Sequence, residues 1–172
     1  MKKILAISIV MIAFAASAFA QVTANATATA TIVTPITLAN AGTDLSFGNV
    51  IPSATLAGTV VVAPDGTPTY TNVTASASPS ATATVTAAAF DVTGTPGAAY
   101  SVTLPVADVT LTGPTSTMVA NTFTNNPSGA ALILDATLGT QSFTVGATLD
   151  VGINQAAGTY LSAPFTVTVN YN

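Results

Sequence analysis

The residues of this sequence that could do chemistry are its carboxylates, because the chain has no glutamate, arginine, histidine, cysteine or tryptophan. They are Asp44, Asp65, Asp91, Asp108, Asp135 and Asp150. Two carboxylates are the minimum for a glycoside hydrolase, and several together can bind calcium. None of the six stands in a D-x-D-x-D-G loop, so either site would need distant residues to meet. The alternative is solvated charge that keeps the protein soluble and discourages unwanted strand pairing.

The other reactive residue types are missing from most of the chain. The two lysines, Lys2 and Lys3, lie at the N-terminus, so no cationic side chain follows them. The remainder cannot build a Ser-His-Asp unit, a Schiff base or a zinc site. It also cannot neutralise phosphates, which excludes a nucleic-acid partner. The composition therefore predicts a protein that is not an enzyme and has no cofactor and no metal.

The N-terminus has the residue order of a secretory signal peptide. The two lysines precede an apolar run from Ile4 to Ala16, which is too short to span a bilayer comfortably. Ala18 and Ala20 then occupy the −3 and −1 positions of an A-x-A cleavage site. We therefore predict a signal peptide over residues 1–20. Cleavage would leave an exported chain without a membrane span, placed at the cell surface or in the extracellular space.

Residues 21–38 form the most regular segment, because small or apolar side chains alternate with polar ones. The apolar row consists of Val22, Ala24, Ala26, Ala28, Ala30 and Ile32. Strict alternation is typical of a β-strand with one apolar face. At a chain end, such an arm can act as a donor strand that completes the sheet of a neighbouring subunit, and four alanines suit a shallow groove. The same periodicity also fits the first strand of the chain's own sheet.

Residues 39–172 have the pattern of short strands separated by turns. The chain holds 32 threonines, and 49% of its residues are hydrophobic. Threonine and valine favour strands, whereas the glutamate, lysine and arginine typical of exposed helices are missing here. Asp65-Gly66, between two strand-like runs, predicts a hairpin. Roughly eight to ten strands with no internal boundary predict one all-β domain, an antiparallel Ig-like β-sandwich preceded by the strand-like arm.

The aromatic residues mostly fall in phase with valine or leucine along these runs. Core packing explains that phase, since aromatic side chains bury large apolar areas. An exposed platform of tyrosines for binding sugars is the alternative. The chain offers four tyrosines and no tryptophan for such a platform.

Three stretches of the sequence carry a family resemblance. They are GTPGAAYSVTLP at 94–105, FTNNPSG at 123–129 and NQAAGTYLSAPFTVTVNYN at 154–172. As a set they are similar to motifs of the bacterial domain-of-unknown-function 4402 family, over about Leu45 to Asn172. The resemblance implies a secreted β-domain of pilin-like or surface-protein character.

The C-terminal segment separately resembles the end of chaperone–usher fimbrial subunits. The residues that carry this likeness are Gly158, Phe165, Val167, Val169 and Tyr171. The resemblance implies a periplasmic chaperone and an outer-membrane usher as partners, and a role in assembly for these residues. The disulfide usual in such subunits cannot form, because the chain has no cysteine.

These observations predict a structural subunit of an extracellular bacterial filament, a fimbria-like or pilus-like polymer. Its partners would be copies of itself, joined head to tail by strand addition, which propagates instead of closing. The alternative is a monomeric secreted or surface-attached β-sandwich that binds glycans in cell adhesion.

Overall fold

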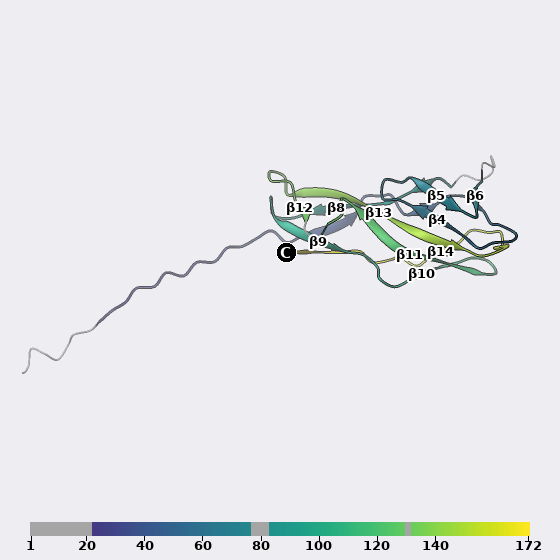
Figure 1. Cartoon of the computed structure of the whole chain (residues 1–172). Helices are drawn as coiled ribbons and strands as arrows, with labels where there is room; N and C mark the ends of the chain where they lie inside the picture. The colour runs from purple at the N-terminus through teal and green to yellow at the C-terminus, as the bar shows by residue number, and fades with distance from the viewer. Residues whose placement is uncertain (1–21, 77–82, 130–131) are drawn as a thin grey trace, which may run out of the picture. The chain divides into compact units, whose positions relative to one another are not determined.

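The computed structural model describes residues 22–76, 83–129 and 132–172 (Figure 1). The predicted signal peptide lies outside the described residues. The chain divides into two compact units between Ile32 and Val33, and only residues 22–32 of the first unit are described. All strands belong to the second unit, Val33–Asn172. The described ranges contain no helix, and hence none that could cross a membrane.

The largest sheet is built around β13 (Thr140–Val151), the longest strand. Its other strands are β1 (Thr37–Asn40), β4 (Gly58–Val62), β5 (Pro68–Thr71), β8 (Ala88–Thr93), β10 (Val109–Thr112), β11 (Thr117–Asn126) and β14 (Leu161–Ser162). β8 and β4 lie end to end along one edge of β13, and β11 pairs with the other edge. The order then continues outward through β10 to β14, and through β8 to β1.

Three smaller sheets pack over this large sheet. The first has the order β12 (Leu132–Ile133), β9 (Ala99–Thr103) and β15 (Thr168–Tyr171). The other two are the ribbons β2 (Ser46–Phe47) with β7 (Val85–Thr86), and β3 (Val50–Ile51) with β6 (Thr74–Ala75). All pairings are antiparallel, so the predicted all-β antiparallel sandwich is confirmed.

The core follows the period-two alternation of β13. Phe143, Val145, Ala147, Leu149 and Val151 are all buried on one face of this strand. Its first half packs beneath the three-stranded sheet, and its second half packs beneath the two ribbons. Within the described residues, the strands that cover the second half of the sandwich are therefore two residues long each.

The structure confirms one turn that the sequence predicted and corrects the predicted number of strands. The Asp65-Gly66 hairpin is confirmed, since β4 and β5 pair around it and Gly66 has a φ of +83°. The expectation of eight to ten strands was too low, because the described chain has fifteen, several only two residues long. The strand-like arm predicted over residues 21–38, with its possible role as a donor strand, stays a prediction. In its described part, strand begins only at Thr37, where β1 pairs with β8.

Gly146 permits a close backbone approach in the middle of β13. A Cβ there would clash with the Val62 carbonyl oxygen and approach the Ala63 carbonyl carbon to 2.7 Å. We expect Gly146→Ala to lower the free energy of unfolding by about 1–3 kcal/mol, because buried backbone atoms would have to move. Thermal unfolding checks this, with Gly152→Ala as the control, whose Cβ would meet only the Gln155 side chain. Equal melting temperatures for the two variants would contradict the prediction.

Candidate functional site

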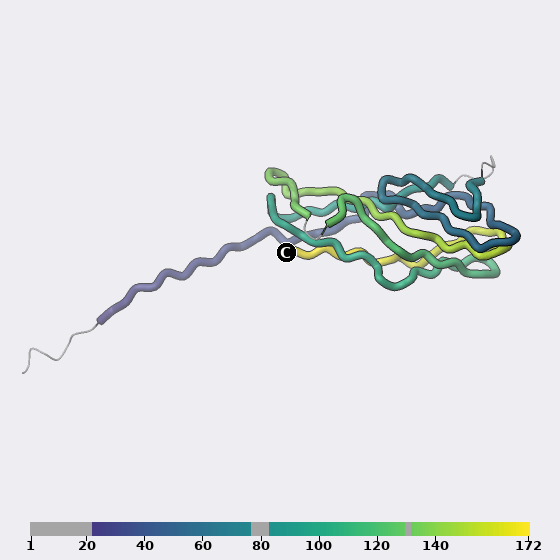
Figure 2. Tube along the Cα trace, viewed as in Figure 1, coloured from purple at the N-terminus to yellow at the C-terminus, as the bar shows by residue number. Residues whose placement is uncertain are grey.

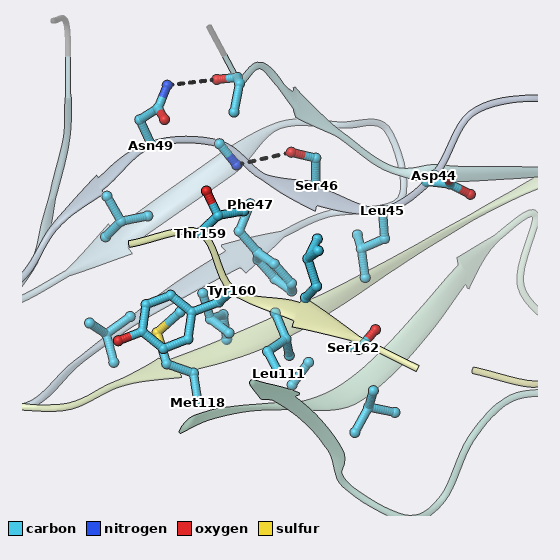
Figure 3. Close-up of a pocket in the computed structure, with 18 of the residues that line it drawn as sticks. Asp44, Leu45, Ser46, Phe47, Asn49, Leu111, Met118, Thr159, Tyr160 and Ser162 are labelled. Atoms are coloured by element: carbon cyan, nitrogen blue, oxygen red, sulfur yellow. Dashed lines mark hydrogen bonds between the residues drawn. The ribbon is translucent and has the colours of Figure 1, made fainter. Parts of the chain in front are cut away.

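A groove of about 1080 Å³ lies between the large sheet and the ribbons that cover its second half. Two stretches of backbone form its sides: Asp44–Pro52, which includes β2 and β3, and Gln155–Ser162, which ends in β14. Its lining on the large sheet is apolar and includes Leu111, Met118, Ala120, Leu149 and Val151. Figure 3 shows Phe47 and Leu45 facing Leu111, Met118 and Tyr160 across this space.

The groove exists because the second layer of the sandwich stops short. β15 begins only at Thr168, and the preceding residues 163–167 form no strand. Beside them the cover consists of the two-residue strands β2 and β3. Leu111, Met118 and Phe165 are consequently only half-buried, although they pack against the core clusters. Protein interiors rarely leave voids larger than a water molecule, so this half of the core is incomplete.

Three strands beside the groove each have an unpaired edge within the described part of the chain. β2 pairs with β7, β3 with β6 and β14 with β10, each on one side only. An unpaired edge presents backbone N–H and C=O groups to any strand that can reach it. The groove therefore combines an apolar floor with backbone edges, which are the two requirements for accepting an extended peptide.

The groove carries almost no charge. Asp44 is the one ionisable carboxylate among its lining residues, and its Oδ1 accepts a hydrogen bond from Asn40 Nδ2 at 3.0 Å. A single carboxylate cannot supply both the acid and the second carboxylate that glycoside hydrolysis uses. The walls thus suit a neutral, apolar segment.

The six aspartates are exposed and spread over the fold. In the described ranges, no three acidic or other metal-ligating side chains come together in a group that could hold a metal ion. Asp91 Oδ1 accepts a hydrogen bond from Ser142 Oγ at 2.6 Å, and Asp150 Oδ2 accepts one from Asn121 Nδ2 at 2.8 Å. These carboxylates bridge neighbouring strands on the solvent face.

Two further aspartates cap turns. Asp65 Oδ1 accepts a hydrogen bond from Thr67 N at 2.9 Å. Asp135 Oδ1 accepts hydrogen bonds from Leu138 N at 2.6 Å and Thr137 N at 2.8 Å. These backbone donors favour the charged carboxylate and hold the pKa of both groups below the ordinary value.

The lowered pKa of Asp135 predicts acid sensitivity. A carboxyl whose folded pKa is depressed stabilises the fold above its unfolded pKa of about 4, and this contribution is lost as the pH falls through the folded value. We expect Asp135→Asn to reduce the fall in melting temperature between about pH 5 and pH 2. Asp108→Asn is the control, because that carboxylate accepts no hydrogen bond from a described residue. Identical pH profiles for the two variants would contradict the role of the Asp135 cap.

The arm residues singled out in the sequence, Val22 to Ile32, are all exposed and form no strand. Val22 is 92% exposed and Ile32 is 98% exposed. The alternating apolar row of this segment is therefore exposed along its whole length.

The C-terminal residues singled out in the sequence lie in the chain's own sandwich. Phe165, Val167, Val169 and Tyr171 pack in one phase against the core under the three-stranded sheet. β15 pairs with β9 over Thr168–Tyr171, as the yellow end of the tube in Figure 2 shows. Gly158, by contrast, is exposed and lines the groove next to Pro114. Phe165 also reaches the groove, where its ring lies 5.1 Å from that of Phe123.

Tyr160 fixes one side of the groove, a role that no sequence motif predicted. Its hydroxyl donates a hydrogen bond to the Ala156 carbonyl oxygen at 2.7 Å and lies 2.6 Å from Ser116 Oγ. Gln155 Nε2 donates to the same hydroxyl at 2.9 Å. The ring packs where a side chain on Gly113 would otherwise stand. Gly113 and Tyr160 are far apart in the sequence, so no local motif indicated that they would pack together.

Tyr171 fixes the beginning of the second unit. Its hydroxyl donates to the Thr34 carbonyl oxygen at 2.7 Å and accepts from Thr95 N at 2.7 Å. The hydroxyl occupies the space that a side chain on Gly94 would need. The backbone just after the arm is therefore held by Tyr171 of β15, whose hydroxyl also binds the turn before β9.

The three motif stretches meet in the fold, since β9 of the first pairs with β15 of the last and Phe123 of the second lies against Phe165 of the last. A family model described as "Domain of unknown function (DUF4402)" matches residues 36–171. The match confirms the resemblance carried by those motifs. No curated protein matches the chain. No solved structure matches it either.

Proposed function

Since this chain belongs to the DUF4402 family, whose description assigns no function, we propose a function from its own geometry. The protein is a structural subunit of an extracellular bacterial filament or fimbria-like polymer, and it is not an enzyme. Strand addition joins the copies: Val22–Ile32 of one subunit occupies the groove of the next. One observation carries the proposal, namely that a single chain holds both an alternating segment without a partner and a groove with unpaired strand edges.

The arm suits the groove in size. Leu111, Met118 and Leu149 form part of an apolar floor on which the backbone of an arm with small side chains could lie closely. The row of four alanines between Val22 and Ile32 supplies them. Eleven extended residues span about 36 Å, enough to run the length of a groove that follows only the second half of the twelve-residue β13.

The arm also suits the groove in polarity. Residues 22–43 carry no charged side chain, so burying the arm's apolar face would remove no charge from water. Its threonines would face solvent on the opposite side, as the alternation of a strand requires. Backbone hydrogen bonds to the free edges of β2 or β14 would satisfy the arm's own N–H and C=O groups.

Export through the periplasm and display at the cell surface complete this proposal. They are supported by the basic, apolar and small residue order of residues 1–20. A periplasmic chaperone and an outer-membrane usher are the proposed assembly partners, and the likeness of the C-terminal segment to chaperone–usher subunits supports them.

A synthetic peptide of residues 21–34 tests the proposal on a variant that lacks Val22–Thr31. A ligand that binds only the folded state stabilises it, by about 2.7 kcal/mol at a hundred times its Kd. We therefore expect a saturable rise in melting temperature. The matched control is the same peptide with Ala26 and Ala28 replaced by aspartate, which should have no effect. No rise with the unchanged peptide would contradict strand addition and favour the monomeric binding module.

A further inference from the structure

A second contact between copies follows from the exposed aliphatic side chains of the second unit, and it rests on the proposed function. We infer that the two ends of the sandwich pack directly against each other in the polymer, in addition to the arm in the groove. Outside residues 22–32, most of the large exposed hydrophobic side chains in the described chain lie at these two ends.

The first end is where the unit begins. Its root patch consists of Val33, Ile133 and Leu138, each more than half exposed. Thr34 N donates a hydrogen bond to Thr95 Oγ1 at 3.1 Å, and Gly94 N donates one to the Gly139 carbonyl oxygen at 2.8 Å. Val33 and Leu138 therefore flank the same Gly94-Thr95 turn. Ile133 lies beside it, on β12.

The second end is where the groove opens. Its rim patch consists of Ile51, Leu56 and Ile153, each at least half exposed. Asn154 N donates a hydrogen bond to the Ser53 carbonyl oxygen at 2.9 Å, and its side chain donates one to the Ala54 carbonyl oxygen at 3.3 Å. These bonds join the loops that carry Leu56 and Ile153. Ile51 itself lines the groove.

The two patches lie at opposite ends of one strand. Leu138 stands two residues before β13, and Ile153 stands two residues after it. Twelve strand residues span about 40 Å, so the patches cannot contact each other within one subunit. A contact between the root patch of one copy and the rim patch of the next joins different surfaces, and it propagates in a line.

The contact of the arm with the groove is continuous with the contact between the root patch and the rim patch. Val33 directly follows Ile32, so the root patch is the first surface of the donor that reaches the acceptor once the arm is bound. Ile51 belongs to both the groove and the rim patch. The inference thus orients the arm, with its Ile32 end at the rim and its Val22 end toward Phe165.

Charge does not drive this contact. Asp135 lies in the turn that carries Leu138, and Asp150 lies near the end of β13 beside Ile153. Both are acidic, so the two ends repel weakly and the attraction is apolar. Salt should accordingly favour assembly, because it screens the repulsion between exposed carboxylates.

Single aspartate substitutions in the full chain test the inference. We expect Leu138→Asp and Leu56→Asp each to raise the critical concentration for polymerisation about tenfold or more, because each removes a leucine from an apolar contact. Val106→Asp is the control, since this residue is fully accessible and lies outside both patches. Critical concentrations equal to that of Val106→Asp would overturn the inference. The rise in melting temperature caused by the arm peptide should be the same with Leu56→Asp, which separates this contact from the groove.

Disulfide trapping gives a second measurement, because the chain has no native cysteine. Under oxidation, a mixture of Leu138→Cys and Ile153→Cys should form a mixed disulfide dimer in preference to either variant alone. Preferential self-linking of Leu138→Cys would overturn the inference, because it would indicate a closed root-to-root dimer. A mixed dimer without any effect of the arm peptide would contradict strand addition and leave the end-to-end contact standing.

Discussion

Deletion of Val22–Thr31 should abolish polymerisation and leave a folded, soluble monomer. The core belongs entirely to Val33–Asn172, and every residue from Val22 to Ile32 is exposed, so the fold loses no buried side chain with the arm. The polymer, by contrast, loses the strand that we propose fills the groove of each neighbour. Negative-stain microscopy and sedimentation of the full chain and the deletion variant measure both outcomes.

A control for this deletion keeps the length of the arm and removes its pattern. Replacing residues 22–31 with glycine and serine should also prevent polymerisation, because a flexible polar segment has no apolar row. An unchanged melting temperature in both variants would show that the domain itself is intact. Filaments formed by either variant would rule out the arm as the connecting strand.

The two faces of the arm should respond differently to charge. Ala28→Asp places a carboxylate on the apolar row, where binding would take it out of water without a partner. An unpaired buried charge costs several kcal/mol, so we expect the critical concentration to rise by about a hundredfold or more. Light scattering across a dilution series measures the change.

Thr27→Asp is the matched variant, because it adds the same charge one residue away on the polar face. A strand directs neighbouring side chains to opposite faces, so this carboxylate should remain in solvent and change assembly little. An equal loss in both variants would indicate general charge repulsion. Equal tolerance of both would contradict the burial of the alanine row.

Features encoded over short stretches of sequence could be predicted. The hairpin at Asp65-Gly66 needs only a turn that tolerates a positive φ between two strand-forming runs. The apolar phase of Phe165, Val167, Val169 and Tyr171 likewise packs against the core as expected, although the closing strand itself begins only at Thr168. Both depend on residues that are neighbours in the chain.

The strand partner of residues 21–38 could not be predicted from their alternation. The alternation indicates which side chains share a face, but it contains no information about which backbone lies beside them. Of this segment, the structure pairs β1 with β8, and Val22–Ile32 form no strand with any described residue. A donor strand and a first strand of the same sheet have the same local pattern, so residue order alone could not separate them.

The class of this protein follows from its residue types alone: an all-β chain, rich in threonine and poor in charge, with six carboxylates as its conventional ionisable chemistry beyond Lys3. The open half of the sandwich, by contrast, depends on how distant segments pack. The groove requires Phe47, Leu111 and Tyr160 to meet from three distant parts of the chain. The same holds for the apolar ends, since Leu138 and Ile153 are separated by the whole of β13. Periodicity specifies a face within one strand, whereas a void or a patch depends on how far the second layer extends, which is a property of long-range packing.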